Sequence, residues 1–468
     1  MAARSKFTVE SLAKLGAKRL AEILIAEAGR NRQLKQAVHM ALAAESGSAE
    51  VGHQIRKRLA QIGRSEAFVT SEKARELANE LERLRSAIVE TIGAGNPKLA
   101  GELLWQLINL HSSVFERLDD SSGRVGDLFR SACGDLGPLL KRAKIKPGEL
   151  APMVLQRIVD NGYGIYDGIV LTLNEALGRE GRKVLRQLLD ERRQSHLVSE
   201  KRAAVRPGQF DYTLSGLLLA VRDIADCEND VDAFIDTYEG FDLTNPAYAT
   251  EIAQRLLRAG RPQEALLYLD QGAPNERNRQ FKALEWCDVR IGVLDALGRK
   301  DDAQALRFAL FDRHLSAPYL KAYLKQLDDF DDVEAERAAL AQVERHGNVH
   351  AALAFLINWP ALDRAAQVVD DRIEQIDGDL YELLDPAAFA LEGKHPLAAV
   401  LLRRRLIDFT LQRARSTRYR HAVRHVREIE SQQSDIVDYG RHENHAAFMT
   451  RLKREHARKP AFWSLLSG

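Results

Sequence analysis

Two stretches of the sequence decide the fold: residues 256–270 read LLRAGRPQEALLYLD, and residues 293–308 read VLDALGRKDDAQALRF. Each stretch has apolar residues at helical spacing on both sides of a glycine. The two glycines, Gly260 and Gly298, are 38 residues apart. Because glycine adopts the left-handed conformation that ends many helices, we expect each glycine to separate the two helices of a pair.

An alanine follows each of these glycines after five residues, at Ala265 and Ala303. Its short side chain allows the second helix to approach the first closely. Gly393 and Ala398 repeat the step, and residues 356–366 (LINWPALDRAA) have the same pattern without the glycine. Since one such pair cannot bury its apolar face alone, the pattern predicts helix pairs that stack along the chain.

These segments resemble tetratricopeptide repeats. The glycines and alanines of the two quoted stretches match the turn glycine and the small residue of that family. Leu256 and Leu294 stand where the family has a tryptophan or tyrosine, so the repeats are degenerate. The resemblance implies a protein-interaction scaffold.

Composition favours helices over the whole chain of 468 residues, because Leu, Ala, Arg, Asp and Glu dominate and there are only 13 prolines. Lys and Arg number 68 against 67 Asp and Glu, which excludes a uniformly basic or uniformly acidic protein. The three cysteines are far apart, which excludes a disulfide scaffold and fits a reducing compartment. There is no apolar run long enough for a signal peptide or a membrane span, so we expect a cytoplasmic protein.

We therefore predict an all-α protein with three parts. Residues 1–195 form an N-terminal helical bundle or array, residues 210–430 form tetratricopeptide-like helical repeats, and residues 431–468 form a C-terminal helical cap. The polar and basic segment 191–209 marks the first boundary. The cap hides the last apolar face of the array with four residues: Phe462, Trp463, Leu465 and Leu466.

Two N-terminal segments allow more than one interpretation. Residues 71–92 carry leucines and an isoleucine with heptad spacing, which fits either a helix in an intramolecular bundle or a dimerisation seam. Residues 160–168 (DNGYGIYDG) contain three glycines. We expect an irregular connection between helices there, because neither a Walker sequence nor a preceding strand indicates a phosphate-binding loop.

The whole chain resembles a bacterial family of uncharacterised all-helical proteins. The resemblance is carried by residues 10–28 (ESLAKLGAKRLAEILIAEA), 103–129 (LLWQLINLHSSVFERLDDSSGRVGDLF) and 397–426 (LAAVLLRRRLIDFTLQRARSTRYRHAVRHV). It implies no particular activity. The end of the chain, from 419 to 466, is also similar to the helical tails of SWIM-type zinc-finger proteins, but the cysteines of that finger are absent.

The C-terminal segment is basic, with fifteen Lys and Arg against seven Asp and Glu in residues 401–460. Such cations can form a solvated or internally paired face, can bind an acidic protein, or can neutralise nucleic-acid phosphates. The acidic run 328–334 (DDFDDVE) is a candidate internal partner. The arginines that we expect to contact a partner or a phosphate are Arg413, Arg420, Arg424 and Arg427.

Histidines lie in the same segment. His421 and His425 are one helical turn apart, so both could ligate one metal ion, although partly exposed histidines on a basic helix are a simpler interpretation. Residues 442–445 read HENH, one residue short of the HExxH motif of metalloproteases. No Gly-x-Ser-x-Gly motif occurs, and the cysteines lie in apolar helical contexts. We predict neither enzyme activity nor a cofactor.

The sequence thus favours a non-enzymatic cytoplasmic scaffold that binds an unidentified protein partner. The alternative is a nucleic-acid-associated protein that uses the basic C-terminal helices, residues 403–459. A third hypothesis is a metal enzyme at the histidine cluster. The surface should distinguish the three hypotheses. An apolar groove favours the scaffold, and a basic groove favours nucleic-acid binding. A cluster of histidines and carboxylates favours the metal enzyme.

Overall fold

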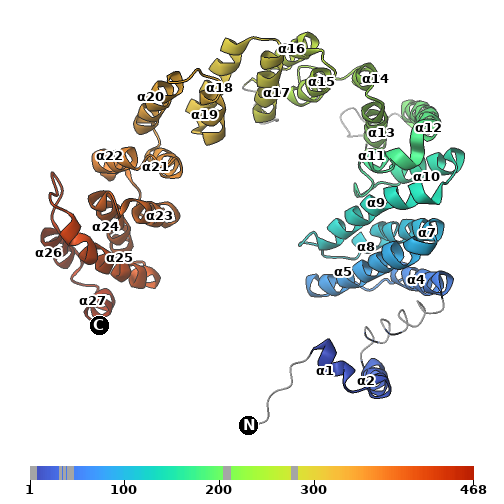
Figure 1. Ribbon diagram of the computed structural model, residues 1–468, viewed down its shortest axis with the longest axis horizontal. Helices are drawn as coiled ribbons and strands as arrows, with labels where there is room; N and C mark the ends of the chain where they lie inside the picture. The colour runs from blue at the N-terminus through green and yellow to red at the C-terminus, as the bar shows by residue number, and fades with distance from the viewer. Residues whose placement is uncertain (1–7, 31–33, 35–37, 39–46, 204–211, 276–282) are drawn as a thin grey trace. The chain divides into compact units, whose positions relative to one another are not determined.

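The computed structural model describes residues 8–30, 34, 38, 47–203, 212–275 and 283–468. All regular elements in these ranges are helices, and one isolated bridge joins Val69 and Leu118 (Figure 1). The predicted all-α class is therefore confirmed. The chain is divided into two compact units, residues 1–242 and 243–468.

The core of the first unit includes α7 (Pro97–Ile108), whose apolar residues Leu103, Leu104 and Leu107 are fully buried. Asn96 caps this helix by accepting from the N–H of Leu99, and Pro97 occupies its first position. The helices of the unit are α1 (Val9–Ala13), α2 (Ala17–Arg30), α4 (Ser48–Gly63), α5 (Ser71–Ser86), the π-helix η1 (Ala87–Ile92), α6 (Gly93–Gly95), α7 (Pro97–Ile108), α8 (His111–Phe115), α9 (Arg124–Ala143), α10 (Pro147–Val159), α11 (Ile169–Thr172), α12 (Asn174–Ala203), α13 (Tyr212–Glu228) and α14 (Val231–Asp236).

The heptad-spaced residues of α5 and η1 belong to the core of the first unit. Leu81, Leu84 and Ile88 are buried there, and α5 packs against α9. The seam is therefore covered within the chain. Residues 160–168 form the expected irregular connection, in which Gly164 and Gly168 have φ of 67° and 70°.

The boundary between the units differs from the predicted one. Helix α13 packs on α10, α11 and α12, so it belongs to the first unit. The division falls between 242 and 243, whereas the sequence places it in the polar segment 191–209. Residues 204–211 of that segment lie outside the described ranges.

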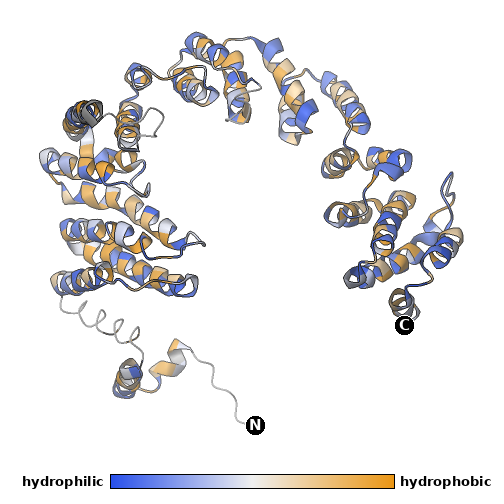
Figure 2. Cartoon of the chain, turned by 180° about the vertical axis from the view of Figure 1, so that it is seen from behind, coloured by the Kyte–Doolittle hydropathy of each residue, from blue (hydrophilic) through white to orange (hydrophobic). Residues whose placement is uncertain are grey.

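The second unit is a succession of helices whose main contacts join each helix to its next or next-but-one neighbour. Figure 2 shows hydrophobic residues on the sides where these helices meet. Its helices are α15 (Pro246–Arg258), α16 (Pro262–Gln271), α17 (Ala283–Ala296), α18 (Lys300–His314), α19 (Ala317–Leu324), α20 (Asp331–Arg345), α21 (Val349–Asn358), α22 (Leu362–Arg372), η2 (Ile373–Gln375), α23 (Tyr381–Leu391), α24 (Pro396–Gln412), η3 (Ser416–Arg418), α25 (Tyr419–Gln432), η4 (Gln433–Asp435), α26 (His445–His456) and α27 (Pro460–Ser467).

The two predicted turn glycines have the left-handed conformation, since φ is 73° at Gly260 and 72° at Gly298. The alanines five residues later, Ala265 and Ala303, are fully buried. Each turn is closed by the hydrogen bond of a Schellman motif, and the same bond closes the α21–α22 turn, which has no glycine. The three bonds are Arg261 N–H to Leu256 O (2.8 Å), Arg299 N–H to Leu294 O (2.9 Å) and Ala361 N–H to Leu356 O (2.9 Å).

Gly393 does not follow this pattern, because it is not among the residues with positive φ. It lies three residues before the first position of the next helix, Pro396, whereas Gly260 lies two residues before Pro262. The longer turn is closed instead by the N–H of His395, which donates to Leu391 O at 2.7 Å. A left-handed residue is not needed there.

The end of the second unit has its own apolar cluster, which includes Val400, Tyr419 and Phe448. Phe462 is fully buried in this cluster, and Trp463 and Leu466 pack against it. Leu465 is exposed. No described helix is long and apolar enough to cross a bilayer.

Candidate functional site

Helix α25 carries most of the residues that the sequence singles out, and it places them on two faces. Its buried face includes Val423 and Val426, which pack in the apolar cluster at the end of the second unit. Its exposed face carries four basic or histidine side chains, Arg420, His421, Arg424 and Arg427. Apolar residues at helical spacing produce this division.

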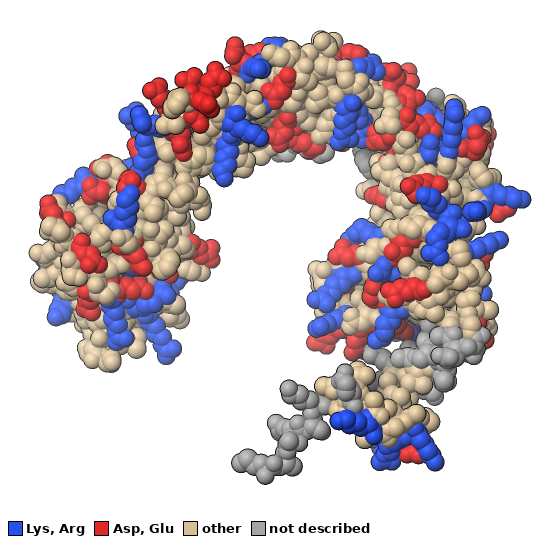
Figure 3. Space-filling model, viewed as in Figure 1, with Lys and Arg blue, Asp and Glu red and all other residues tan. Residues whose placement is uncertain are grey.

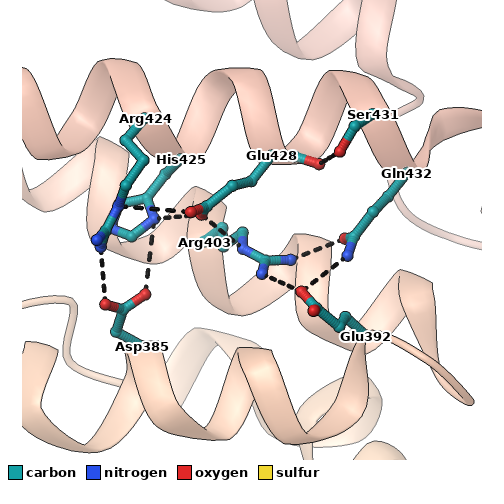
Figure 4. Close-up of polar contacts among 8 residues, drawn as sticks. All are labelled: Asp385, Glu392, Arg403, Arg424, His425, Glu428, Ser431 and Gln432. Atoms are coloured by element: carbon teal, nitrogen blue, oxygen red, sulfur yellow. Dashed lines mark hydrogen bonds and ion pairs between the residues drawn. The ribbon is translucent and has the colours of Figure 1, made fainter.

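Arg403, a buried arginine of α24, links the turn between α23 and α24 to α25. Arg403 donates to Glu392 at 2.6 Å, to Glu428 at 3.0 Å and to Gln432 at 2.7 Å (Figure 4). Gln432 also donates to Glu392, at 3.1 Å. The planar guanidinium thus donates hydrogen bonds to acceptors in the α23–α24 turn and in two successive turns of α25.

The same network continues to Asp385 on α23. Arg424 donates to this carboxylate at 2.7 Å and lies 3.4 Å from Glu428. His425 has Nδ1 at 3.0 Å from Glu428 and 3.8 Å from Asp385. Figure 4 shows the three carboxylates of the network facing these basic groups. We call the set Asp385, Glu392, Arg403, Arg424, His425, Glu428 and Gln432 the ionic network.

Burial lowers the pKa of His425, and the hydrogen bond to Glu428 and the charge of Asp385 oppose that effect only in part. The ring is therefore neutral near pH 7. Because Glu428 is an acceptor, the contact assigns the proton to Nδ1, which donates.

Asp385, His425 and Glu428 are the group whose ligand atoms lie close enough to share a metal ion, within 4.8 Å of one another in the described part of the chain. Both carboxylates, however, already accept hydrogen bonds from guanidinium groups, Asp385 from Arg424 and Glu428 from Arg403. A cation would have to displace these charges. The arrangement is that of an ion-pair network.

The predicted metal pair is not brought together in this network. His425 is buried in it, whereas His421 is exposed and is not part of the group of potential ligands. Two histidines one turn apart share a helix face, but here the edge of the packed interface passes between them. The hydrogen-bond partner of His425 is Glu428 on the same helix, and the second nearby carboxylate, Asp385, comes from α23.

The four predicted contact arginines also have different surroundings. Arg424 is held by the ionic network. Arg413, Arg420 and Arg427 are exposed, and no ion pair is formed by them within the described ranges. Figure 3 shows Lys and Arg side chains projecting from the C-terminal end of the second unit. These three arginines are available to a ligand.

The acidic run 328–334 is not the internal partner of the basic segment. Among the described residues, the carboxylates that pair with its arginines include Asp379 with Arg418 and Asp385 with Arg424. The acidic run forms the α19–α20 turn and the first turn of α20 (Figure 3). Negative side chains are favourable at that helix end because of the helix dipole.

Sequence reasoning missed the acidic half of the ionic network. Asp385 and Glu392 lie on or beside α23, where they look like ordinary exposed carboxylates of a helical segment. Arg403 gave a weak signal, since it is a charged residue within the apolar face of α24. A charge at a core position indicates a buried partner but does not say which one.

The fold and the network define an all-helical protein with a charged junction between three consecutive helices. The chain belongs to the family of unknown function DUF6880, whose family model matches residues 2–465. The predicted membership in an uncharacterised all-helical family is thereby confirmed. Neither the curated proteins nor the solved structures contain a match to it.

Proposed function

We propose that this protein is a non-enzymatic cytoplasmic scaffold that binds a protein partner through the helices of its second unit. The observation that carries the proposal is the Schellman turn that recurs at Gly260, at Gly298 and before Ala361. Recurrent helix pairs with contacts between neighbours are the architecture of tetratricopeptide-like arrays, which expose long binding surfaces. The three free cysteines agree with a reducing compartment.

Exposed apolar side chains support the same proposal. Phe389 on α23 is 73% exposed, and Leu267 on α16 is 69% exposed. The core of the unit is built from other residues of these helices, such as Leu269 on α16 and Leu384 on α23, so neither exposed side chain is needed for it. Aromatic side chains such as Phe389 are enriched at the centres of protein interfaces.

The test is affinity capture of the tagged full-length chain from its own cells, divided into nuclease-treated and untreated halves. We expect a protein partner that survives nuclease and binds the purified chain directly. Phe389→Ser should weaken that binding at least tenfold, whereas Val437→Ser, a matched change of an exposed apolar residue outside the helices, should not. A folded chain that captures only background would contradict the proposal.

The second candidate function is nucleic-acid binding by the basic face. It is favoured by the exposure of Arg413, Arg420 and Arg427 and by the lack of ion pairs to them in the described residues. Partners lost on nuclease treatment would support it.

For this candidate, replacement of the three arginines by Ala should weaken binding and reduce the slope of log affinity against log salt by about 3. The matched control removes three exposed lysines of the first unit, Lys57, Lys98 and Lys146. If both triple variants weaken binding equally, only the total charge of the protein matters, and the basic face is not a specific nucleic-acid site.

A further inference from the structure

A second buried arginine of α24 has an unusual environment. Arg404 is 4% exposed, and its guanidinium lies 4.7 Å from the ring centre of Phe448 and 5.5 Å from that of Tyr439. Its Nη1 donates to the carbonyl oxygen of Glu443 at 2.6 Å. Its Nε and Nη2 have no hydrogen-bond partner among the described residues.

These two free nitrogens form one edge of the guanidinium. Their N–H groups are parallel and match two oxygens bonded to one atom, as in a carboxylate or a phosphate. The aromatic rings interact with the cation but do not replace the missing acceptors at this edge. Since buried donors are nearly always satisfied, the open edge of Arg404 indicates a missing acceptor.

The neighbouring carboxylates do not supply that acceptor, because Arg451 binds them. Arg451 lies 3.0 Å from Asp408 and 2.8 Å from the carboxylate of Glu443. Glu443 therefore offers only its carbonyl oxygen to Arg404. The positive charge of Arg404 is left without a paired anion among the described side chains.

The start of α26 adds further positive potential beside Arg404. Glu443 directly precedes Asn444, the N-cap of that helix, so the guanidinium lies next to the positive end of the helix dipole. His445, the first residue of α26, has a buried Nδ1 without a partner among the described residues. The charge of Arg404 is also felt by His445, whose pKa is lowered mainly by burial.

We propose that Arg404 anchors a binding site for a small free oxyanion, a phosphate or a carboxylate. The Nε and Nη2 edge would hold two of its oxygens, and His445 at the start of α26 would donate a third hydrogen bond. The occupant is a single negatively charged group, because one cation lacks its counterpart.

Access to this site is controlled by the segment 436–443, which covers Arg404 through Tyr439 and Glu443. The tip of this segment is in solvent, with Val437 fully exposed. Its far side is held to α22 by His442, whose Nε2 is 2.6 Å from Asp370. The oxyanion enters when this segment moves away from α24.

The test is calorimetric titration of the full-length chain with sodium phosphate and, in a separate arm, with sodium acetate, both at constant ionic strength in chloride. We expect saturable binding with one site per chain. Binding of both anions defines a general oxyanion site, binding of phosphate alone a phosphate site, and binding of acetate alone a carboxylate site. Absence of saturable binding in both arms would overturn the proposal.

Variants locate the site. Arg404→Lys keeps the charge but removes the two-pronged edge, so the dissociation constant should rise at least tenfold. Arg427→Lys, the same change at an exposed position, should leave it unchanged. If Arg404→Lys does not fold, His445→Ala takes its place and should weaken binding about fivefold. An unchanged dissociation constant in the Arg404 or His445 variant, or loss of binding only on replacing Arg413, Arg420 and Arg427, would overturn the proposal.

Discussion

Arg403 connects three parts of the second unit through a single side chain. Its partners are Glu392 after α23, and Glu428 and Gln432 on α25. A buried guanidinium is stabilising only while its partners remain, because an isolated charge in the interior is costly. The residues of the ionic network should therefore depend on one another.

We expect Arg403→Ala to lower the free energy of unfolding of the second unit by about 2–3 kcal/mol. The value lies at the low end for a buried pair because the side chains of Glu392 and Glu428 are about one-third exposed. Urea unfolding of the full-length chain measures the change. Arg427→Ala, at an exposed position, is the control and should change the free energy by less than about 0.5 kcal/mol. Equal effects of the two changes would contradict the role of Arg403.

The pH dependence of stability should contain a contribution from His425. Its pKa is lower in the folded chain than in the unfolded chain, where it is about 6.5. Below pH 6.5 the unfolded state therefore binds the proton first, so stability is complete above this pH and is lost as the pH falls toward the folded pKa. We expect His425→Asn to flatten the decrease between pH 7 and 5, by at most about 1.4 kcal/mol per pH unit.

Chemical unfolding of wild type and variant at pH 7, 6 and 5 measures this slope. His421→Asn is the control, because that ring is exposed. Part of the slope should remain in every single variant, since burial also lowers the pKa of His111, His445 and His456. A His425→Asn slope identical to that of wild type would show that His425 does not contribute.

At the scale of single residues, the sequence shows which segments are charged but not which charged residues pair with each other. It indicates that Arg424 and His425 lie in a charged region, yet their partner Asp385 is about 40 residues earlier and has no local signal. Which turn of α23 faces α25 depends on the packing of α24 between them. The spacing of His421 and His425 gives the helix face but not the position of its buried edge.

The helix pairs are predictable where a local rule decides them. Gly260 and Gly298 were expected to be left-handed, and both are. Gly393 does separate two helices, but it is not left-handed, and the step of five to Ala398 does not reveal that its turn is one residue longer. The pair at 356–366 uses the same hydrogen bond without glycine, so sequence reasoning finds it only by comparison with its neighbours.

This difference gives a prediction for the three glycines. A Cβ at Gly260 or Gly298 meets no atom within 4 Å, so Gly→Ala there costs only the left-handed conformation, about 1 kcal/mol or more. Gly393→Ala also meets no atom and has no positive φ, so it should be neutral or slightly stabilising. Thermal unfolding of the three variants compares them. A loss at Gly393 as large as at Gly260 would contradict the assignment of the turns.

The whole molecule has separate apolar cores in its two units. Leu103 is fully buried in the core of the first unit, and Leu356 is fully buried in that of the second. The sequence predicts abundant core for both, but it places the boundary in a polar segment. It could not show that α13 packs back onto α10–α12, because that contact depends on tertiary structure.

We expect each core to be destabilised independently. Leu103→Ala should cost about 2–5 kcal/mol and increase amide hydrogen exchange within 48–242, with little change in 243–468. Leu356→Ala should increase amide hydrogen exchange within 243–468, with little change in 48–242. Hydrogen-exchange mass spectrometry of the full-length chain measures both. Faster exchange throughout the chain in either variant would show that the units unfold together.

The packing of each helix of the second unit against its near neighbours has a mechanical consequence. A force applied at residue 468 would act on α27 first. Detachment of α27 would expose α25 without disturbing α20. The segment 436–443 is the exception, since it reaches back to α22 and should resist until Asp370 is released. Under tension the unit should therefore lengthen in a series of small steps rather than by one large rupture.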